Sequence, residues 1–196
     1  MKLTADLTFR ETAHLSGVNP SAVEKAVELK VMTPISARAR VKGGATRRLP
    51  LKAVVYFSAL REAGCADLPV RHKKAIWTMV KKSKLDALEP VEFAPGMRID
   101  LPRLSAEPLR NATAYRDARD RHIVSDPEIL GGTPVIRGTR ISVYSVLGRL
   151  QNGDDLEDLV ADYPDIPKNA FGAASLYATA HPMRGRPSGR PWRNAA

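Results

Sequence analysis

Cysteine is almost absent from this chain, since Cys65 is the only one among 196 residues. An intrachain disulfide needs two thiols, and a thiolate zinc site needs more than one, so the sequence excludes both. We expect Cys65 to be a small buried apolar residue. The four histidines, His14, His72, His122 and His181, are scattered, with none at ligand spacing from another. They therefore indicate neither a metal site nor a nucleophile relay.

Long apolar runs are also missing. No stretch reaches the roughly 18 apolar residues that a membrane span requires. The first residues, MKLTADLTFRETA, have neither the basic cluster nor the apolar stretch of a signal peptide. We therefore expect a cytoplasmic protein with no membrane partner.

The sequence offers little that is typical of a catalytic centre. The glycine-rich stretch GGTPVIRGTR lacks the Gly-Lys-Ser/Thr ending of a phosphate-binding loop. Carboxylates gather in one segment, at Asp154, Asp155, Glu157, Asp158, Asp162 and Asp165. They fall along one predicted surface helix and its caps, whereas a metal-dependent nuclease needs carboxylates that converge from separate elements. We expect no enzyme activity, no metal and no cofactor.

The net charge of +10 is unevenly distributed. Residues 1–84 hold 17 Lys and Arg against 6 Asp and Glu, whereas residues 123–182 hold 4 against 8. The last fourteen residues hold four Arg and no acid. A basic first part followed by an acidic one suggests that the first part contacts nucleic acid; the alternative is a merely solubilising surface.

The first predicted helix covers Leu7–Leu15. Thr8 is a candidate N-cap, and Glu11 stands three residues later as its capping-box partner. Gly17 is expected to end this helix, because glycine readily adopts the backbone conformation of a helix C-terminus.

A second helix is predicted directly after this glycine. Asn19 and Pro20 are suited to the N-cap and the first turn, and apolar residues recur at helical spacing down to Val31. Helix, tight turn and helix together predict a helix-turn-helix, which presents its second helix to the major groove of DNA.

A wing is predicted next. Ile35 begins a strand in which basic residues alternate with apolar ones, Gly43-Gly44 forms a turn, and a return strand follows. Helices are expected over 49–63, closed by Gly64, and over 70–85. The candidate DNA-binding residues are Ser21 and Lys25 on the exposed side of the second helix, and Arg38, Arg40, Lys42, Arg47 and Arg48 in the wing. Arginines there can reach phosphates or a narrow minor groove.

The remaining elements are shorter. A hairpin is predicted around Pro95-Gly96, and residues 106–122 form a polar connecting element of uncertain order. Two short strands are expected on either side of Arg137-Gly138, with Arg137 and Arg140 bridging to acidic neighbours. Three helices follow: one over 143–150, one capped by Asp154 with Glu157 at the capping-box position, and one that Pro167 begins.

Residues 7–60 resemble the winged helix-turn-helix of the MerR type. The resemblance rests on FRETAHLSGVNPSAVEKAVELKVMTP, followed by the wing turn from Gly43 to Arg48. The chain departs from the pattern after the wing, where Arg48-Leu49 replaces the usual aromatic residue.

Residues 123–181 resemble the bacterial domain-of-unknown-function family 433, which is often found in toxin–antitoxin operons. The hallmark is DPEILGGTPVIRGTRISV, followed by Gly153-Asp154 and an acidic helix that ends in Tyr163-Pro164. Together the two resemblances imply a VapB-like antitoxin, which binds its own operator and neutralises a PIN-domain ribonuclease toxin.

The C-terminal segment is rich in arginine, proline and glycine, and we expect it to be flexible. Its candidate toxin-binding residues are Arg184, Arg186, Arg190, Trp192 and Arg193. The arginines suit the carboxylates of a nuclease active site. Arg184-Gly185-Arg186-Pro187 also resembles an AT-hook, which lies in the minor groove, so DNA contact remains an alternative, as does a tail without special function.

We therefore predict an α+β, mostly helical protein. The expected parts are a winged helix-turn-helix domain over 1–84, a connecting hairpin and linker over 85–122, a small three-helix, homeodomain-like domain with a short hairpin over 123–182, and a basic tail over 183–196. A homodimer is expected because operators are commonly palindromic. The alternatives are a stand-alone MerR-type transcriptional regulator and, third, an interaction scaffold that binds no DNA.

Overall fold

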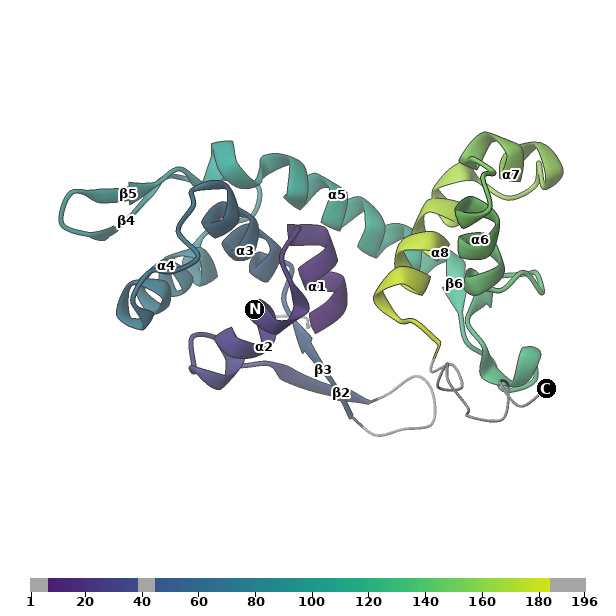
Figure 1. Ribbon diagram of the computed structural model, residues 1–196, viewed down its shortest axis with the longest axis horizontal. Coiled ribbons are helices and arrows are strands. Elements are labelled where there is room, and N and C mark those ends of the chain that lie inside the picture. Colours follow the sequence, from purple (N-terminus) through teal and green to yellow (C-terminus); the bar gives the residue numbers. More distant parts are fainter. Residues whose placement is uncertain (1–6, 39–44, 184–196) are drawn as a thin grey trace, which may run out of the picture.

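The protein is a mostly helical α+β chain, seen here in a computed structural model that describes residues 7–38 and 45–183 (Figure 1). The N-terminal part contains β1 (Leu7–Thr8), α1 (Phe9–Ser16), α2 (Pro20–Glu28), β2 (Ile35–Arg38), β3 (Ala45–Leu49), α3 (Lys52–Glu62) and α4 (Val70–Lys82). The rest contains β4 (Val91–Ala94), β5 (Met97–Ile99), α5 (Leu101–His122), β6 (Ile123–Val124), β7 (Val135–Ile136), α6 (Val143–Gln151), α7 (Leu156–Asp162) and α8 (Lys168–Ala180). The sheets among these residues are small and antiparallel.

The predicted helix-turn-helix is confirmed, with its caps. The Thr8 side chain and Glu11 form the capping box of α1, and Gly17 ends this helix in the left-handed conformation with φ 64°. Asn19 caps α2. This helix ends at Glu28 rather than at Val31, because Lys30 turns the chain with φ 53° and the Val31 N–H then donates to the Ala26 carbonyl.

The wing forms a three-stranded sheet with the order β1-β3-β2. Ile35 pairs with Arg48, and Arg38 pairs with Ala45. The turn predicted at Gly43-Gly44 lies outside the described residues. The following helix begins at Lys52 rather than at Leu49, because Leu49 belongs to β3 and pairs with Leu7.

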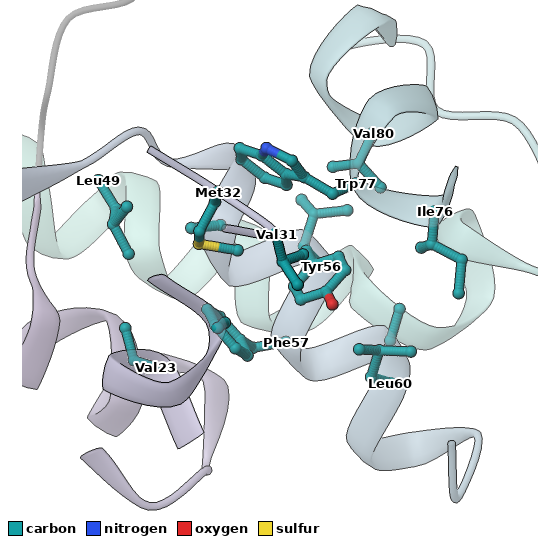
Figure 2. Packing of buried hydrophobic residues seen from close by; sticks show 14 of the residues in the cluster. Val23, Val31, Met32, Leu49, Tyr56, Phe57, Leu60, Ile76, Trp77 and Val80 are labelled. Atoms are coloured by element: carbon teal, nitrogen blue, oxygen red, sulfur yellow. The ribbon is translucent and has the colours of Figure 1, made fainter. Parts of the chain in front are cut away.

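Helix α3 forms the centre of the N-terminal core. All of its residues from Lys52 to Leu60 are buried. Tyr56 contacts Phe57 and Trp77 edge-on, with ring centroids 5.0 and 5.7 Å apart (Figure 2). The buried Lys52 ammonium donates to the Lys81 carbonyl over 2.7 Å, which joins the beginning of α3 to the end of α4.

Cys65 is only half-buried, so our expectation of a buried residue is wrong. It lies just beyond the end of α3, after Gly64, where the chain runs along the surface. It still packs against the edge of the core that α3 centres.

Residues 106–122, a connecting element whose order the sequence left open, are helical. They belong to α5, a helix of 22 residues that packs against both α3 and α8. Its buried side includes Ser105, Ala112, Tyr115 and Arg119. Small and polar side chains occupy much of this side, so the apolar periodicity of the sequence is weak. In Figure 1 the helix runs from the N-terminal part to the C-terminal helices.

The strands expected on either side of Arg137-Gly138 are partly wrong. Val135–Ile136 is a strand, but it pairs with Ile123–Val124, so that Ile123 faces Ile136. After Gly138, where φ is 79°, the chain makes only an isolated bridge between Val135 and Ser142. The predicted 91–101 hairpin is confirmed, since β4 and β5 pair around Pro95-Gly96.

The C-terminal part contains α6, α7 and α8 around Phe171, which is fully buried. The second of these helices is capped by Asp155 with Asp158 at the capping-box position, one residue later than we predicted for Asp154 and Glu157. Asp154 instead forms an ion pair with Arg149. The third helix begins at Lys168, one residue after the start that we predicted, and Pro167 is its N-cap.

The corrected cap predicts a difference between two neighbouring aspartates. Asp155→Ala should lower the free energy of unfolding by about 1 kcal/mol, because the N–H groups of Glu157 and Asp158 lose their acceptor. Asp154→Ala is the matched control and should cost less than about 0.5 kcal/mol, since it removes a partly exposed ion pair. Urea unfolding of both variants tests this. Equal losses would contradict the assignment of Asp155 as the cap.

Among the helices of the described residues, none is long and apolar enough to cross a bilayer. The longest, α5, has Arg or Asp at many of its positions.

Candidate nucleic-acid interface and the junction behind it

The exposed side of α2 presents two of the predicted DNA-binding residues. Ser21 and Lys25 are both exposed, while Val23 and Ala26 of the same helix are buried in the core. The Asn19 side chain accepts hydrogen bonds from the Ser21 N–H at 2.9 Å and from its hydroxyl at 2.8 Å. The start of α2 is thus fixed in shape, and the long Lys25 side chain extends from a rigid base.

The wing places Arg47 and Arg48 differently. Arg47 is exposed, and its guanidinium lies over the Phe9 ring with 5.0 Å to the centroid. Arg48 is half-buried and pairs with Thr8 in the sheet. In Figure 1, α2 and the β2–β3 strands both lie along the lower edge of the molecule, so Lys25 and Arg47 belong to elements of one side.

Several predicted residues cannot be placed in this way. The backbone of Arg38 pairs within the wing, but its side chain is outside the described part of the structure, as are Arg40 and Lys42. The predicted toxin-binding residues Arg184, Arg186, Arg190, Trp192 and Arg193 also lie outside it. Glu24 and Glu28 are exposed on α2 and reduce the positive charge of this helix.

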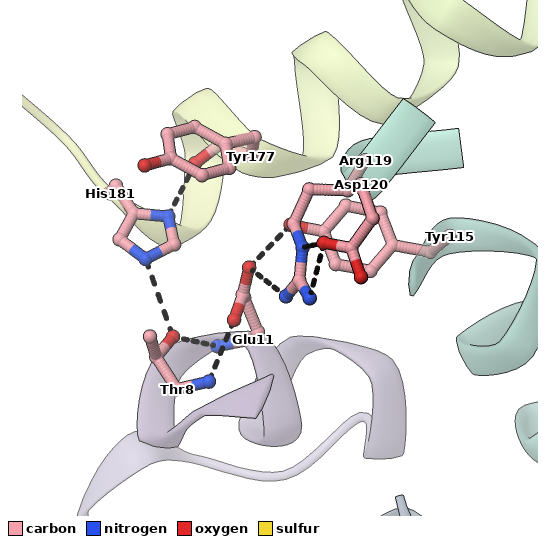
Figure 3. A network of polar contacts seen from close by, with 7 residues as sticks. All are labelled: Thr8, Glu11, Tyr115, Arg119, Asp120, Tyr177 and His181. Atoms are coloured by element: carbon pink, nitrogen blue, oxygen red, sulfur yellow. Dashed lines mark hydrogen bonds and ion pairs between the residues drawn. The ribbon is translucent and has the colours of Figure 1, made fainter. Parts of the chain in front are cut away.

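A buried polar cluster lies directly behind the helix-turn-helix (Figure 3). We call it the junction network, and it consists of Thr8, Glu11, Tyr115, Arg119 and His181. The side chain of Glu11 is 1% exposed and that of Arg119 is 4% exposed, and their charged atoms are 3.0 Å apart. The Tyr115 hydroxyl donates to the same carboxylate oxygen over 2.6 Å.

The other carboxylate oxygen of Glu11 accepts the N–H of Thr8 at 2.7 Å, so one side chain serves both the helix cap and the ion pair. The Thr8 hydroxyl lies 3.3 Å from Nε2 of His181, at the end of α8. The Tyr144 hydroxyl donates to the His181 carbonyl over 2.9 Å. These contacts join α1, α5, α6 and α8, and therefore fix the helix-turn-helix against the C-terminal part.

The neighbours of Glu11 in the junction network keep its carboxylate ionised. Burial by itself would raise the pKa of Glu11, but the Arg119 guanidinium, the Tyr115 hydroxyl and the Thr8 N–H outweigh it and hold this pKa below its ordinary value of 4.5. Burial and the neighbouring carboxylate raise the pKa of Tyr115. The phenol therefore remains a hydrogen-bond donor to an ionised Glu11.

From the sequence we assigned Glu11 only to a helix cap and treated the segment of Arg119 as a linker, so the network was not predicted. The sequence held little evidence for the network, because a buried arginine in a polar segment has no characteristic sequence pattern. Contacts that span more than 100 residues of sequence, such as those of Glu11 with Tyr115 and Arg119, follow from tertiary packing.

Five of the six carboxylates of residues 154–165 serve local structure. Asp154 and Asp162 pair with Arg149, Asp155 and Asp158 cap α7, and Glu157 pairs with Lys168. Residues 7–38 and 45–183 contain no group of three His, Cys, Asp or Glu placed to hold a metal ion. Arg137 was expected to bridge to an acid, but its Nε donates to the Arg121 carbonyl over 2.8 Å.

The C-terminal part, with its β6–β7 pair and three helices, is also the part that a known family covers. Residues 123–178 match the family described as protein of unknown function (DUF433). This matched segment contains α6, α7 and most of α8, whereas the residues of the junction network lie outside it, His181 just beyond its end.

Two individual proteins are similar to the chain. The uncharacterized protein y4eO of Sinorhizobium fredii (strain NBRC 101917 / NGR234) is 39% identical over 84 residues, which are 43% of this chain and 36% of that protein. The chain thus matches about a third of the length of this relative. The X-ray crystal structure of Rv2018 from Mycobacterium tuberculosis aligns with 87% of this chain and 97% of its own, at 18% identity and a TM-score of 0.36.

Proposed function

We propose that this chain is a cytoplasmic DNA-binding antitoxin that represses its own operon and neutralises a PIN-domain ribonuclease toxin. The observation that carries the DNA-binding part is the helix-turn-helix, in which a rigid α1–Gly17–α2 unit exposes Lys25 beside a wing that exposes Arg47. A metal-independent, non-enzymatic role fits a site made of cations rather than of converging carboxylates.

The physical argument starts from the shape of DNA. An α-helix fits the major groove, and exposed residues of its first turns reach base edges and phosphates. Ser21 and Lys25 occupy such positions on α2, and Arg47 suits an adjacent phosphate. One such module covers a small site, so we propose that a homodimer binds a palindromic operator.

Lys25→Ala combined with Arg47→Ala should weaken operator binding by about tenfold or more and reduce the slope of log affinity against log salt by about 2, because two phosphate contacts are lost. Fluorescence anisotropy with the promoter fragment at several salt concentrations measures both quantities. Lys74→Ala, an exposed lysine of α4, is the matched control. Unchanged affinity and slope in the double variant, with unfolding like that of the wild type, would remove this surface from the proposal.

The antitoxin part is supported by the resemblance of residues 123–181 and by the arginines of residues 184–196. Co-expression with the product of the adjacent gene should give a stable complex without ribonuclease activity, and deletion of residues 183–196 should restore that activity. Recovery of the chain alone, still bound to its promoter, would instead support the stand-alone MerR-type regulator. Full inhibition by the deletion variant would overturn the role of these arginines.

A further inference from the structure

A cavity of about 510 Å³ opens beside the helix-turn-helix, between α2, α3 and the segment that leads into α4. Its size is within the range of about 300–1,000 Å³ that is typical of small-molecule sites. On the α2 side it is lined by Ser21, Ala22, Lys25, Ala26 and Leu29, which are residues of one stripe of the helix. Nothing in the proposed DNA contacts requires a cavity at this place.

The inner wall of the cavity is apolar and rigid. Tyr56, Phe57 and Leu60 of the buried helix α3 form it, together with Val31 (Figure 2). Leu29 also lines the cavity and is 37% exposed. An apolar wall with two aromatic residues favours an apolar, partly aromatic ligand body.

The rim of the cavity is mainly basic. Lys25 and Lys73 line it, and within the described residues neither forms an ion pair. Arg61 also lines it, close to the turn at Gly17, and pairs with Glu62. Asp67 is the carboxylate among the lining residues, so the cations exceed the acids at the opening.

We propose that this cavity binds a small amphipathic organic anion, with an aromatic or branched apolar body and one carboxylate, and that the bound anion releases the operator. The body would cover the wall of α3, and the carboxylate would reach the ammonium groups of Lys25 and Lys73. Inorganic anions leave the apolar wall uncovered, and neutral ligands leave the cations without a partner.

The coupling to DNA rests on the proposed function. Ser21 and Lys25 line the cavity and are also the α2 residues that we assign to DNA. A carboxylate bound to Lys25 competes directly with a phosphate for the same ammonium group. Ligand and operator are therefore expected to exclude each other.

Ligand binding is tested on the full chain without DNA. The probe is the aromatic anion 8-anilinonaphthalene-1-sulfonate, whose fluorescence rises in apolar surroundings, and the competitors are 3-phenylpropionate and its neutral amide. We expect saturable binding of the probe. The carboxylate should displace the probe at a concentration at least about fivefold lower than the amide does. The Kd of the probe should be at least about fivefold higher in Lys73→Gln. Equal displacement by acid and amide would overturn the anionic ligand class.

Two variants make this test specific. Lys74→Gln removes the same charge from the next position of α4, outside the cavity lining, and should bind the probe like the wild type. Ala22→Phe places a large side chain into the cavity from an exposed position of α2 and should abolish binding. Equal weakening in Lys73→Gln and Lys74→Gln, or undisturbed binding in a folded Ala22→Phe variant, would overturn the site.

Release of the operator by the ligand is tested with the promoter fragment. Saturating 3-phenylpropionate should weaken operator binding several-fold in the wild type and have no effect in Ala22→Phe. Undiminished operator binding by a ligand-saturated protein would overturn the release step alone. A chain that binds the probe as expected but binds no operator would overturn the proposed function and leave the ligand site supported.

Discussion

Arg119→Met should lower the free energy of unfolding by about 3–5 kcal/mol, the largest loss that we expect from a single replacement in this chain. The guanidinium is buried and lies 3.0 Å from the equally buried carboxylate of Glu11. Methionine fills similar space but leaves that carboxylate without its cation, and an uncompensated buried charge costs far more than an exposed pair contributes.

Urea unfolding followed by circular dichroism measures this loss. Arg110→Met is the matched control, because Arg110 is an exposed residue of the same helix, and it should cost less than about 0.5 kcal/mol. The double variant Glu11→Gln/Arg119→Met should recover part of the loss, since it removes both charges. A loss in Arg119→Met no larger than that of Arg110→Met would contradict a buried ion pair.

The junction network connects the helix-turn-helix to α5 and to the end of α8. The carboxylate that caps α1 also holds α5, and the Thr8 side chain approaches His181 at the end of α8. A displacement of α8 from α1 exposes or separates these groups, which costs free energy. The orientation of the helix-turn-helix is therefore coupled to α5 by the buried contacts of Glu11, and to the end of α8 by the partly buried contact between Thr8 and His181.

Local signals explain what the sequence predicted well. Thr8 with Glu11, Gly17, and Asn19 with Pro20 are caps whose physics is contained in four or five neighbouring residues, and the structure has all of them. The cap of α7 was misplaced because Asp154 and Asp155 are equally good cap residues. The choice depends on Arg149, which binds Asp154 from the preceding helix.

The features that the sequence did not predict depend on packing between elements that are far apart in the sequence. Helix α5 buries Ser105, Ala112 and Arg119 against other helices, and these residue types do not distinguish a buried face from a linker. The cavity is formed by α2 and α3 together, so no sequence motif in either helix predicts it. Helical periodicity was enough to predict that Ser21 and Lys25 are exposed, but it did not predict that they also line the cavity.

Acidification should destabilise the protein through Glu11. The pKa of this carboxyl is held below 4.5 in the folded state, so its contribution to stability is fully present above about pH 4.5 and is lost as the pH falls through the folded-state pKa. Between the two pKa values, the loss attributable to one such group approaches about 1.4 kcal/mol per pH unit.

Glu11→Gln should make this part of the pH dependence disappear, because the amide keeps the shape of the cap but does not titrate in this range. Urea unfolding of the wild type and of this variant at pH 7, 5, 4 and 3 gives the difference directly, with Glu24→Gln, an exposed position of α2, as the matched control. The gap in stability between wild type and Glu11→Gln should be largest at pH 7 and should narrow toward pH 3. A gap that stays constant over this range would mean that Glu11 does not carry the charge that Arg119 and Tyr115 are arranged to hold.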